Sequence, residues 1–273
     1  MNVILVLAFI LFFLMEEIGG KQGVKAFFSM IFNVAVLYLG INLMVDHYDP
    51  FLITMITSVI ISCVLLFFNN NINRKTIAAF VSVFITLLFM IFIMDKMGEI
   101  SKIQGFGEEE FDEISSYSLY IGIDFTKLLG CTMIMGLLGA VIDMAISIAS
   151  PMNEFYKNKK ALTKKELFNM GMNVGRDILG TMTNTIYFAF LAGYLALIIW
   201  FKDLSYSLGA IMNSKVFCAE IIQVICSSLG ATLIIPISAA VTTYILFLDC
   251  KPLRPTIFSR KLNQNGDSTD STN

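Results

Sequence analysis

Residues 77–94 read IAAFVSVFITLLFMIFIM, an apolar run without a charged side chain. Arg74 and Lys75 precede the run, and Asp95 and Lys96 follow it. A helix needs about 20 apolar residues to cross a bilayer, because each residue adds about 1.5 Å to a hydrocarbon thickness of about 30 Å. The run therefore predicts a membrane-spanning helix.

Further apolar stretches of similar character lie on both sides of this run. We place the expected spans at about 2–15 (short), 24–45, 50–68, 77–94, 124–149, 178–201 and 216–248. The 273-residue chain is 56% hydrophobic and 15% charged, which is too apolar for a soluble domain. We expect an all-α polytopic integral membrane protein of about seven transmembrane helices in a lipid bilayer. Residues 1–250 would form one multipass domain, and residues 251–273 a disordered cytoplasmic tail.

The first and last spans differ from the others in length. The first begins the chain without a basic region or a cleavage signal, so we expect it to be retained as an anchor. The last is too long for one straight crossing, and Pro236 removes a backbone donor within it. We expect a break near Ile235.

The distribution of basic residues predicts the orientation. Fourteen of the 19 Lys and Arg residues follow spans one, three, five and seven: Lys21, Lys25, Arg74, Lys75, Lys157, Lys159, Lys160, Lys164, Lys165, Arg176, Lys251, Arg254, Arg260 and Lys261. The opposite side holds the other five and an acidic run at 108–113. Because basic residues that flank spans stay in the cytoplasm, we expect the N-terminus outside and the C-terminus inside. An acidic outer loop at about 95–123 and a basic inner loop at about 150–176 follow from this.

The overall charge argues against several functions. A net charge of −2 gives no basic field for nucleic acid, and one His with five scattered Cys does not form a standard zinc site. The inner loop also lacks a Gly-rich phosphate-binding motif. We therefore expect no nucleic-acid partner, no metal and no cofactor.

Polar residues are concentrated in the last three expected spans. In span five, Gly136, Gly139, Asp143 and Ser147 recur at steps of three and four, so they share one helix face. Small residues allow another backbone to approach closely, and polar groups in hydrocarbon normally face partners or a path. This face is therefore predicted to be a seam with a carboxylate in it.

Span six has the same character. Asp177, Gly180 and Asn184 share a face, and Gly171 and Gly175 form a GxxxG pair at its entry. We expect these glycines to pack against a neighbouring helix.

Two further charged positions have open interpretations. Arg176 is expected at the inner interface, where it either pairs with Asp177 or Asp143 or takes part in transport. In span seven, Glu220 shares a stripe with Gln223 and Ser227 near the outer half, and it either lies in the seam or extends into water. Ser147, Asn184 and Gln223 also fit a purely structural role between helices. Asp143 is the residue for which a functional role is favoured, because it is a lone carboxylate inside a span.

An intramembrane protease is a weaker alternative. Asp143 and Asp177 could share a proton, because two close carboxylates do not both ionise easily. The GxGD pattern of such enzymes is absent, and YIGIDF around Asp124 has the wrong spacing. We therefore expect a protein that is not an enzyme.

The segments GAVIDMAISIASPMNEF (139–155) and GMNVGRDILGTMTNTIYFAFLAG (171–193) closely resemble the YibE/F-like family of bacterial multipass membrane proteins. The IQGFGEEE stretch and LGATLIIPISA fit the same pattern. The resemblance implies a pair of proteins, one YibE-type and one YibF-type. The short N-terminal region of this chain is more similar to the YibF-type member. The resemblance implies a multi-pass protein of a bacterial, Gram-positive plasma membrane that acts with a YibE-type partner.

A more distant similarity is to the SecF-like membrane half of the RND permeases. There, an Asp near the inner end of one span precedes a basic loop and a polar stretch that opens the next span. Asp143, the Lys-rich loop, Arg176 and Asn184 occur here in that order.

These patterns favour a subunit of a transport or export assembly. In this interpretation Asp143, helped by Asp177, Arg176 and Asn184, relays protons while spans five to seven rock against the rest. The alternative is a structural or accessory membrane subunit that stabilises partners and transports nothing. The sequence indicates no substrate.

Overall fold

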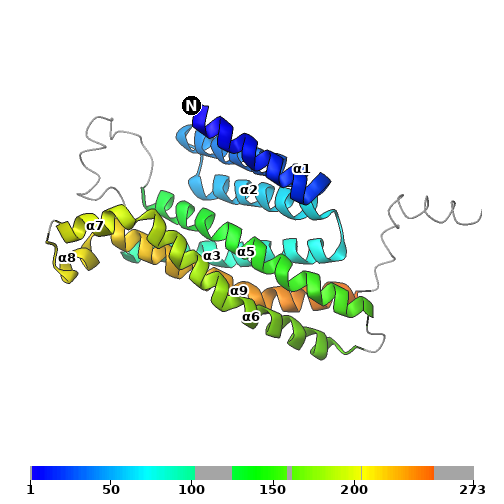
Figure 1. Cartoon of the computed structure of the whole chain (residues 1–273). Coiled ribbons are helices and arrows are strands. Elements are labelled where there is room, and N and C mark those ends of the chain that lie inside the picture. The colour runs from blue at the N-terminus through cyan, green and yellow to red at the C-terminus, as the bar shows by residue number, and fades with distance from the viewer. Residues whose placement is uncertain (1, 102–124, 159–161, 204, 249–273) are drawn as a thin grey trace, which may run out of the picture.

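The computed structural model describes residues 2–101, 125–158, 162–203 and 205–248. Within these ranges every regular element is a helix, and the helices lie side by side in an elongated bundle (Figure 1). They are α1 (Asn2–Val45), α2 (Pro50–Cys63), the π-helical turn η1 (Val64–Phe68), α3 (Arg74–Ser101), α5 (Phe125–Asn158), α6 (Lys164–Gly193), α7 (Leu195–Asp203), α8 (Leu208–Asn213) and α9 (Lys215–Phe247). The expectation of an all-α protein is confirmed.

Most of these helices have the length and composition of membrane spans. Five are apolar enough to cross a bilayer: α1, α2 with η1, α3, α5 and α9. The pair α6 and α7 qualifies only together, with a bend of 54° between the two helices. With five or six such spans, the chain has the character of a multi-pass membrane protein.

The long helix α1 contains a chain reversal at Gly20. The backbone there has φ of 54° and ψ of −138°, a conformation that side-chain-bearing residues rarely adopt. The ring of Phe12 lies 5.0 Å from that of Phe27, although fifteen residues of straight helix would separate them by about 22 Å. The two arms of α1 therefore run back along each other.

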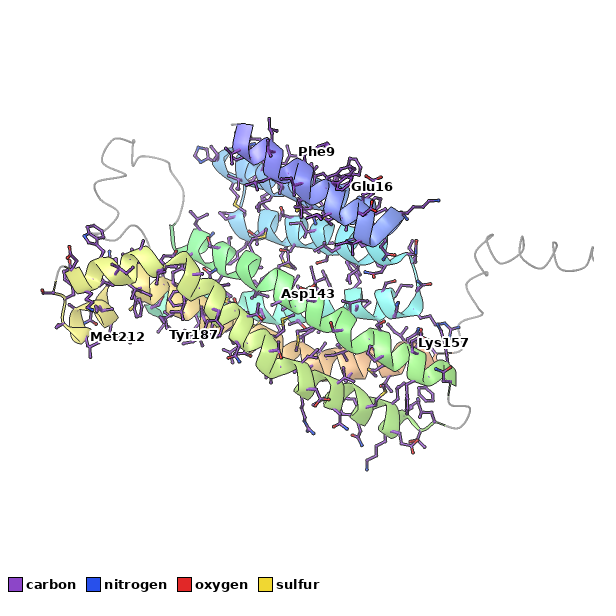
Figure 2. All side chains as sticks on the ribbon, viewed as in Figure 1. Phe9, Glu16, Asp143, Lys157, Tyr187 and Met212 are labelled. Carbon is purple, nitrogen blue, oxygen red and sulfur yellow. The ribbon has the colours of Figure 1, made fainter. Side chains whose placement is uncertain are left out.

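This hairpin lies at the periphery of the bundle. Its only extensive contacts within the described residues are with α2 and η1, and Gln22 donates a hydrogen bond to the carbonyl of Asn69 (3.1 Å). Phe9 on the first arm is exposed and points away from the other helices (Figure 2). Such a surface suits contact with lipid chains.

The core is formed by α3, α5, α6 and α9. Residues such as Leu87, Met133, Ile148 and Leu167 are completely or almost completely buried there. Several hydroxyls of α2 and α3 are also buried, and they bond to the preceding helical turn: Ser62 donates to the Ser58 carbonyl (2.7 Å) and Thr86 to the Ser82 carbonyl (2.9 Å). Because these hydroxyls are satisfied within their own helices, they need no further partner.

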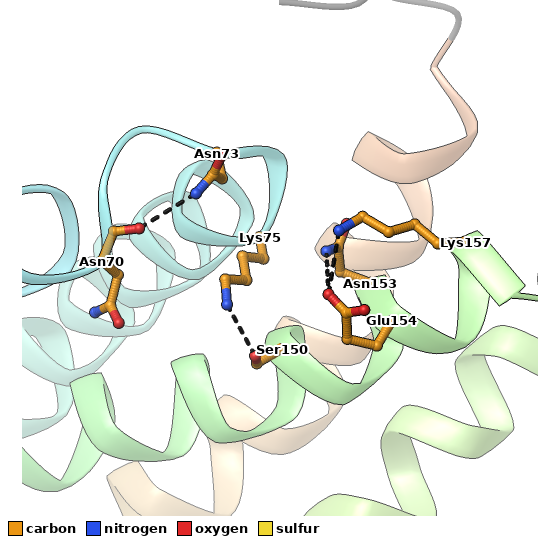
Figure 3. Close-up of polar contacts among 7 residues, drawn as sticks. All are labelled: Asn70, Asn73, Lys75, Ser150, Asn153, Glu154 and Lys157. Carbon is orange, nitrogen blue, oxygen red and sulfur yellow. Dashed lines mark hydrogen bonds and ion pairs between the residues drawn. The ribbon is translucent and has the colours of Figure 1, made fainter. Parts of the chain in front are cut away.

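Polar contacts join neighbouring helices at both ends of α5. At one end, Lys75 of α3 donates to the Ser150 hydroxyl of α5 at 3.1 Å, close to an ion pair within α5 between Glu154 and Lys157 (3.1 Å; Figure 3). At the other end, Lys127 lies 3.6 Å from Asp49, which caps the N-terminus of α2.

The structure changes three of the sequence expectations. First, α9 continues through Pro236 without a break, so the break expected near Ile235 is wrong. Neighbouring helices on several sides hold α9 in place, and a proline is tolerated in a spanning helix under such conditions.

Second, the expected inner loop is mostly helical. Helix α5 extends to Asn158 and α6 begins at Lys164, where Thr163 and Glu166 form a reciprocal capping box. Third, α3 continues to Ser101, beyond the expected end of the fourth span at residue 94. The acidic run at 108–113 and the tail at 251–273 lie outside the described residues.

Candidate functional site

A cleft of about 470 Å³ lies between α5, α6 and α9, and it contains two carboxylates. Asp143 comes from α5 and Glu220 from α9. Its other described lining residues are neutral: Gly136, Gly139, Ala140, Met182, Thr185, Ile186, Ala189, Phe190, Tyr194, Gln223, Val224 and Ser227. The cleft therefore joins the expected faces of spans five and seven, and α6 closes it with residues other than those expected. Its wall has two acids and no base.

The α5 wall of the cleft is the face predicted from the sequence. Gly136, Gly139, Asp143 and Ser147 are all exposed, whereas Met144 and its neighbours on the other side of α5 are buried. The Asp143 side chain makes no hydrogen bond or ion pair with any residue that the structure describes. It lies in the middle part of the bundle, well away from both ends of α5 (Figure 2).

The α9 wall carries the second carboxylate. The Tyr194 hydroxyl, at the bend between α6 and α7, donates to Glu220 at 2.6 Å. Gln223 crosses to α5, where its Nε2 would lie 2.6 Å from a Cβ built on Gly136. Thus Glu220 has a protein partner, while the carboxylate of Asp143 faces the cleft without one among the described residues.

The glycines at the start of α6 fit closely against other helices. A Cβ on Gly171 would lie 2.5 Å from the sulfur of Met152 and 3.0 Å from the Cβ of Ala239. A Cβ on Gly175 would overlap the Cγ2 of Ile235. This close approach fixes the position of α6 against α9.

The other predicted residues of span six face away from the cleft. Arg176, Asp177, Gly180 and Asn184 are exposed, and none of them lines the cleft. Among the residues with described side chains, Arg176 makes no ion pair, so the structure shows neither of the pairings with Asp177 or Asp143 considered above. The structure places Glu220, but not these four residues, on the wall of the cleft that holds Asp143.

Sequence reasoning missed part of the α6 wall. Met182, Thr185, Ala189 and Phe190 line the cleft, and Tyr194 reaches Glu220 beyond the end of α6. The steps of three and four residues among them were a usable signal. Across the described residues there is no group of three His, Cys, Asp or Glu side chains that could hold a metal ion.

Comparison with known protein families gives a match over nearly the whole chain. Residues 7–247 match the family described as YibE/F-like protein. The chain belongs to the YibE/F-like family. The match includes every residue of the cleft, so the site of this YibE/F-like protein lies within the family region. No curated protein and no solved structure matches the chain.

Proposed function

We propose that this YibE/F-like protein is a non-enzymatic subunit of a transport or export assembly and that Asp143 relays protons in it. The observation that supports this most directly is the position of Asp143 on the wall of a cleft inside the bundle, without a hydrogen-bonding partner among the described residues. An ionisable group is costly inside a membrane, and where one occurs it commonly belongs to an ion or proton path.

Glu220 is the second member of the proposed relay. It lines the same cleft, and Tyr194 holds it by a hydrogen bond from α6 to α9. Movement of α6 relative to α9 would change this bond and the width of the cleft together. Arg176, Asp177 and Asn184, which we first considered as helpers, lie on another face and are not part of this relay.

We propose seven crossings of a bacterial plasma membrane, with the N-terminus outside. The two arms of α1 supply the first two crossings, and α6 with α7 supplies a bent sixth. The contact of Gln22 with Asn69 brings Lys21 and Lys25 close to the end of α2 that precedes Arg74. The bond from Lys75 to Ser150 adds the basic end of α5 to the same side. Such a basic side is expected to face the cytoplasm.

Replacing Asp143 by asparagine tests the relay. We expect proton flux through pyranine-loaded proteoliposomes to fall at least tenfold, because asparagine cannot release a proton. The proteoliposomes should contain the protein together with its co-purifying subunits. Glu154→Gln is the matched control, because it removes a carboxylate from the same helix outside the cleft. Unchanged flux in Asp143→Asn would exclude the relay.

We also propose that a YibE-type membrane protein packs over the open side of the cleft, along the exposed small-residue face of α5 that forms its wall. Gly139 and Ser147 lie on this face, and a Cβ on Gly139 would meet no atom within 4 Å. Close approach of a second helix is favoured at such positions.

Gly139→Leu should therefore reduce co-purification of a tagged YibE-type protein at least tenfold. The added side chain enters open space in this chain, so its own helical fold should remain intact by circular dichroism. Gly180→Leu, at an open position on α6, is the matched control and should leave this co-purification unchanged. Equal co-purification with Gly139→Leu and the control would show that the partner does not use α5.

A structural or accessory role remains the second candidate function. The open glycine face of α5 fits this role, because small residues are enough to hold a partner helix, but the role assigns no task to Asp143 on the same face. In that case the Asp143→Asn protein would retain its partners and the activity of the whole assembly. Access of a water-soluble thiol reagent to Asp143→Cys would count against it.

A further inference from the structure

Helix α6 has two faces of different character. One face packs into the bundle through buried residues such as Leu167, Gly171 and Gly175. The opposite face carries Asn173, Arg176, Asp177, Gly180 and Asn184, all of which are exposed. Tyr187 on the same side lies at the outer edge of the bundle (Figure 2).

This polar face lies at the depth of the membrane. Asn184 stands between Met182 and Thr185 in the sequence, and both line the cleft that holds Asp143. Gly175, next to Arg176, packs against Ile235 in the interior of α9. Lipid chains offer no partner for an amide, a guanidinium or a carboxylate at this depth. Another protein surface is therefore needed to cover α6.

The charges on this face are arranged symmetrically about a line of neutral residues. Asn173, Gly180 and Asn184 are separated by seven and four residues, so they form a line along the helix. At about 100° per residue, Arg176 lies about 60° to one side of Asn173, and Asp177 lies about 40° to the other side. The face therefore has a basic edge and an acidic edge at almost the same height.

We propose that a second copy of this chain covers this face, related by a two-fold axis along the membrane normal. Copies inserted in the same orientation can be related only by axes of this direction, so the two α6 helices run parallel. A two-fold axis places Arg176 beside the partner subunit's Asp177, and Asp177 beside the partner subunit's Arg176. Both charges are then paired, and the face is complementary to itself.

The neutral residues of the line fit the same arrangement. A Cβ built on Gly180 would meet no atom within 4 Å, so the glycine leaves room for a second helix to approach. Asn184 would face the partner's Asn184, and two amides can each donate and accept a hydrogen bond. This surface is distinct from the cleft and from the α5 face proposed for the YibE-type protein.

Charge reversal with two differently tagged copies tests the proposal. Arg176→Asp alone and Asp177→Arg alone should each weaken self-association at least tenfold, because like charges then meet across the axis. Co-expression of the two single variants should restore co-purification of the two tags, and so should the double variant in both copies. Adjacent residues of one helix do not face each other, so recovery within a single chain is not expected.

Two controls keep the test decisive. Lys165→Glu reverses a charge on the same helix about three turns away from Arg176 along the axis, and it should leave self-association unchanged. If the single charge variants do not fold, Gly180→Leu replaces them, because it should lower the dimer fraction where Gly139→Leu does not. The proposal is overturned if the mixed charge variants associate no better than each alone, or if Gly180→Leu leaves the dimer fraction unchanged.

Discussion

Replacing Gly175 by leucine is expected to destabilise the protein by about 3 kcal/mol or more. The first carbon of the new side chain would overlap the Cγ2 of Ile235 on α9, a β-branched residue with little rotamer freedom in a helix. The two helices would have to separate at their tightest contact. Thermal loss of the helical circular dichroism signal in detergent should therefore begin at a lower temperature.

A second change provides an internal check on this result. Ile235→Ala removes three carbons from the opposing side chain, against the four that leucine adds at position 175, so it should recover part of the lost stability in the double variant. Gly139→Leu adds the same side chain in open space and should change the stability little. If Gly175→Leu were as stable as Gly139→Leu, the packing of α6 on α9 would be wrong.

Replacing Gly23 by leucine should open the hairpin of α1. A Cβ on Gly23 would overlap the carbonyl oxygen of Met15, and because that atom belongs to the backbone, a rotamer change cannot relieve the overlap. We expect this overlap to destabilise the closed hairpin by about 3 kcal/mol or more. The arms should therefore separate, and the contact between Phe12 and Phe27 should be lost.

Chemical cross-linking can detect this opening. A protein with Phe12→Cys and Phe27→Cys should give a linked peptide pair with a short bismaleimide, and mass spectrometry would identify the pair. Adding Gly23→Leu should abolish the link, whereas Gly19→Leu, with no atom within 4 Å of its new Cβ, should affect it little. A link that persists in Gly23→Leu would mean that the arms do not meet there.

Apolar run length predicted much of the fold. The expected span at 50–68 matches α2 with η1, and the expected span at 216–248 differs from α9 by one residue at each end. These results follow because a bilayer requires a nearly fixed length of apolar helix. The reversal at Gly20 falls in the connection expected between the spans at 2–15 and 24–45, although apolar run length does not indicate which residue of 16–23 carries it.

Periodicity predicted which polar residues share a face, but not where each face points. In α6 both Gly171 with Gly175 and Asp177 with Asn184 form regular stripes, and only the first stripe faces the bundle. Spacing along one helix has no information about the position of the next helix. Asp143 and Glu220 line one cleft because α5 and α9 pack side by side, a contact between distant segments of the chain.

The bend of 54° between α6 and α7 has a spectroscopic consequence. Trp200 is the only tryptophan in the sequence, and it lies on α7, just beyond the bend, with 45% of its surface exposed. Tryptophan emission in this protein therefore reports the polarity around α7 alone. A shift of its maximum, without a change in helix content, would be a native fluorescence signal for motion of α7 relative to α6.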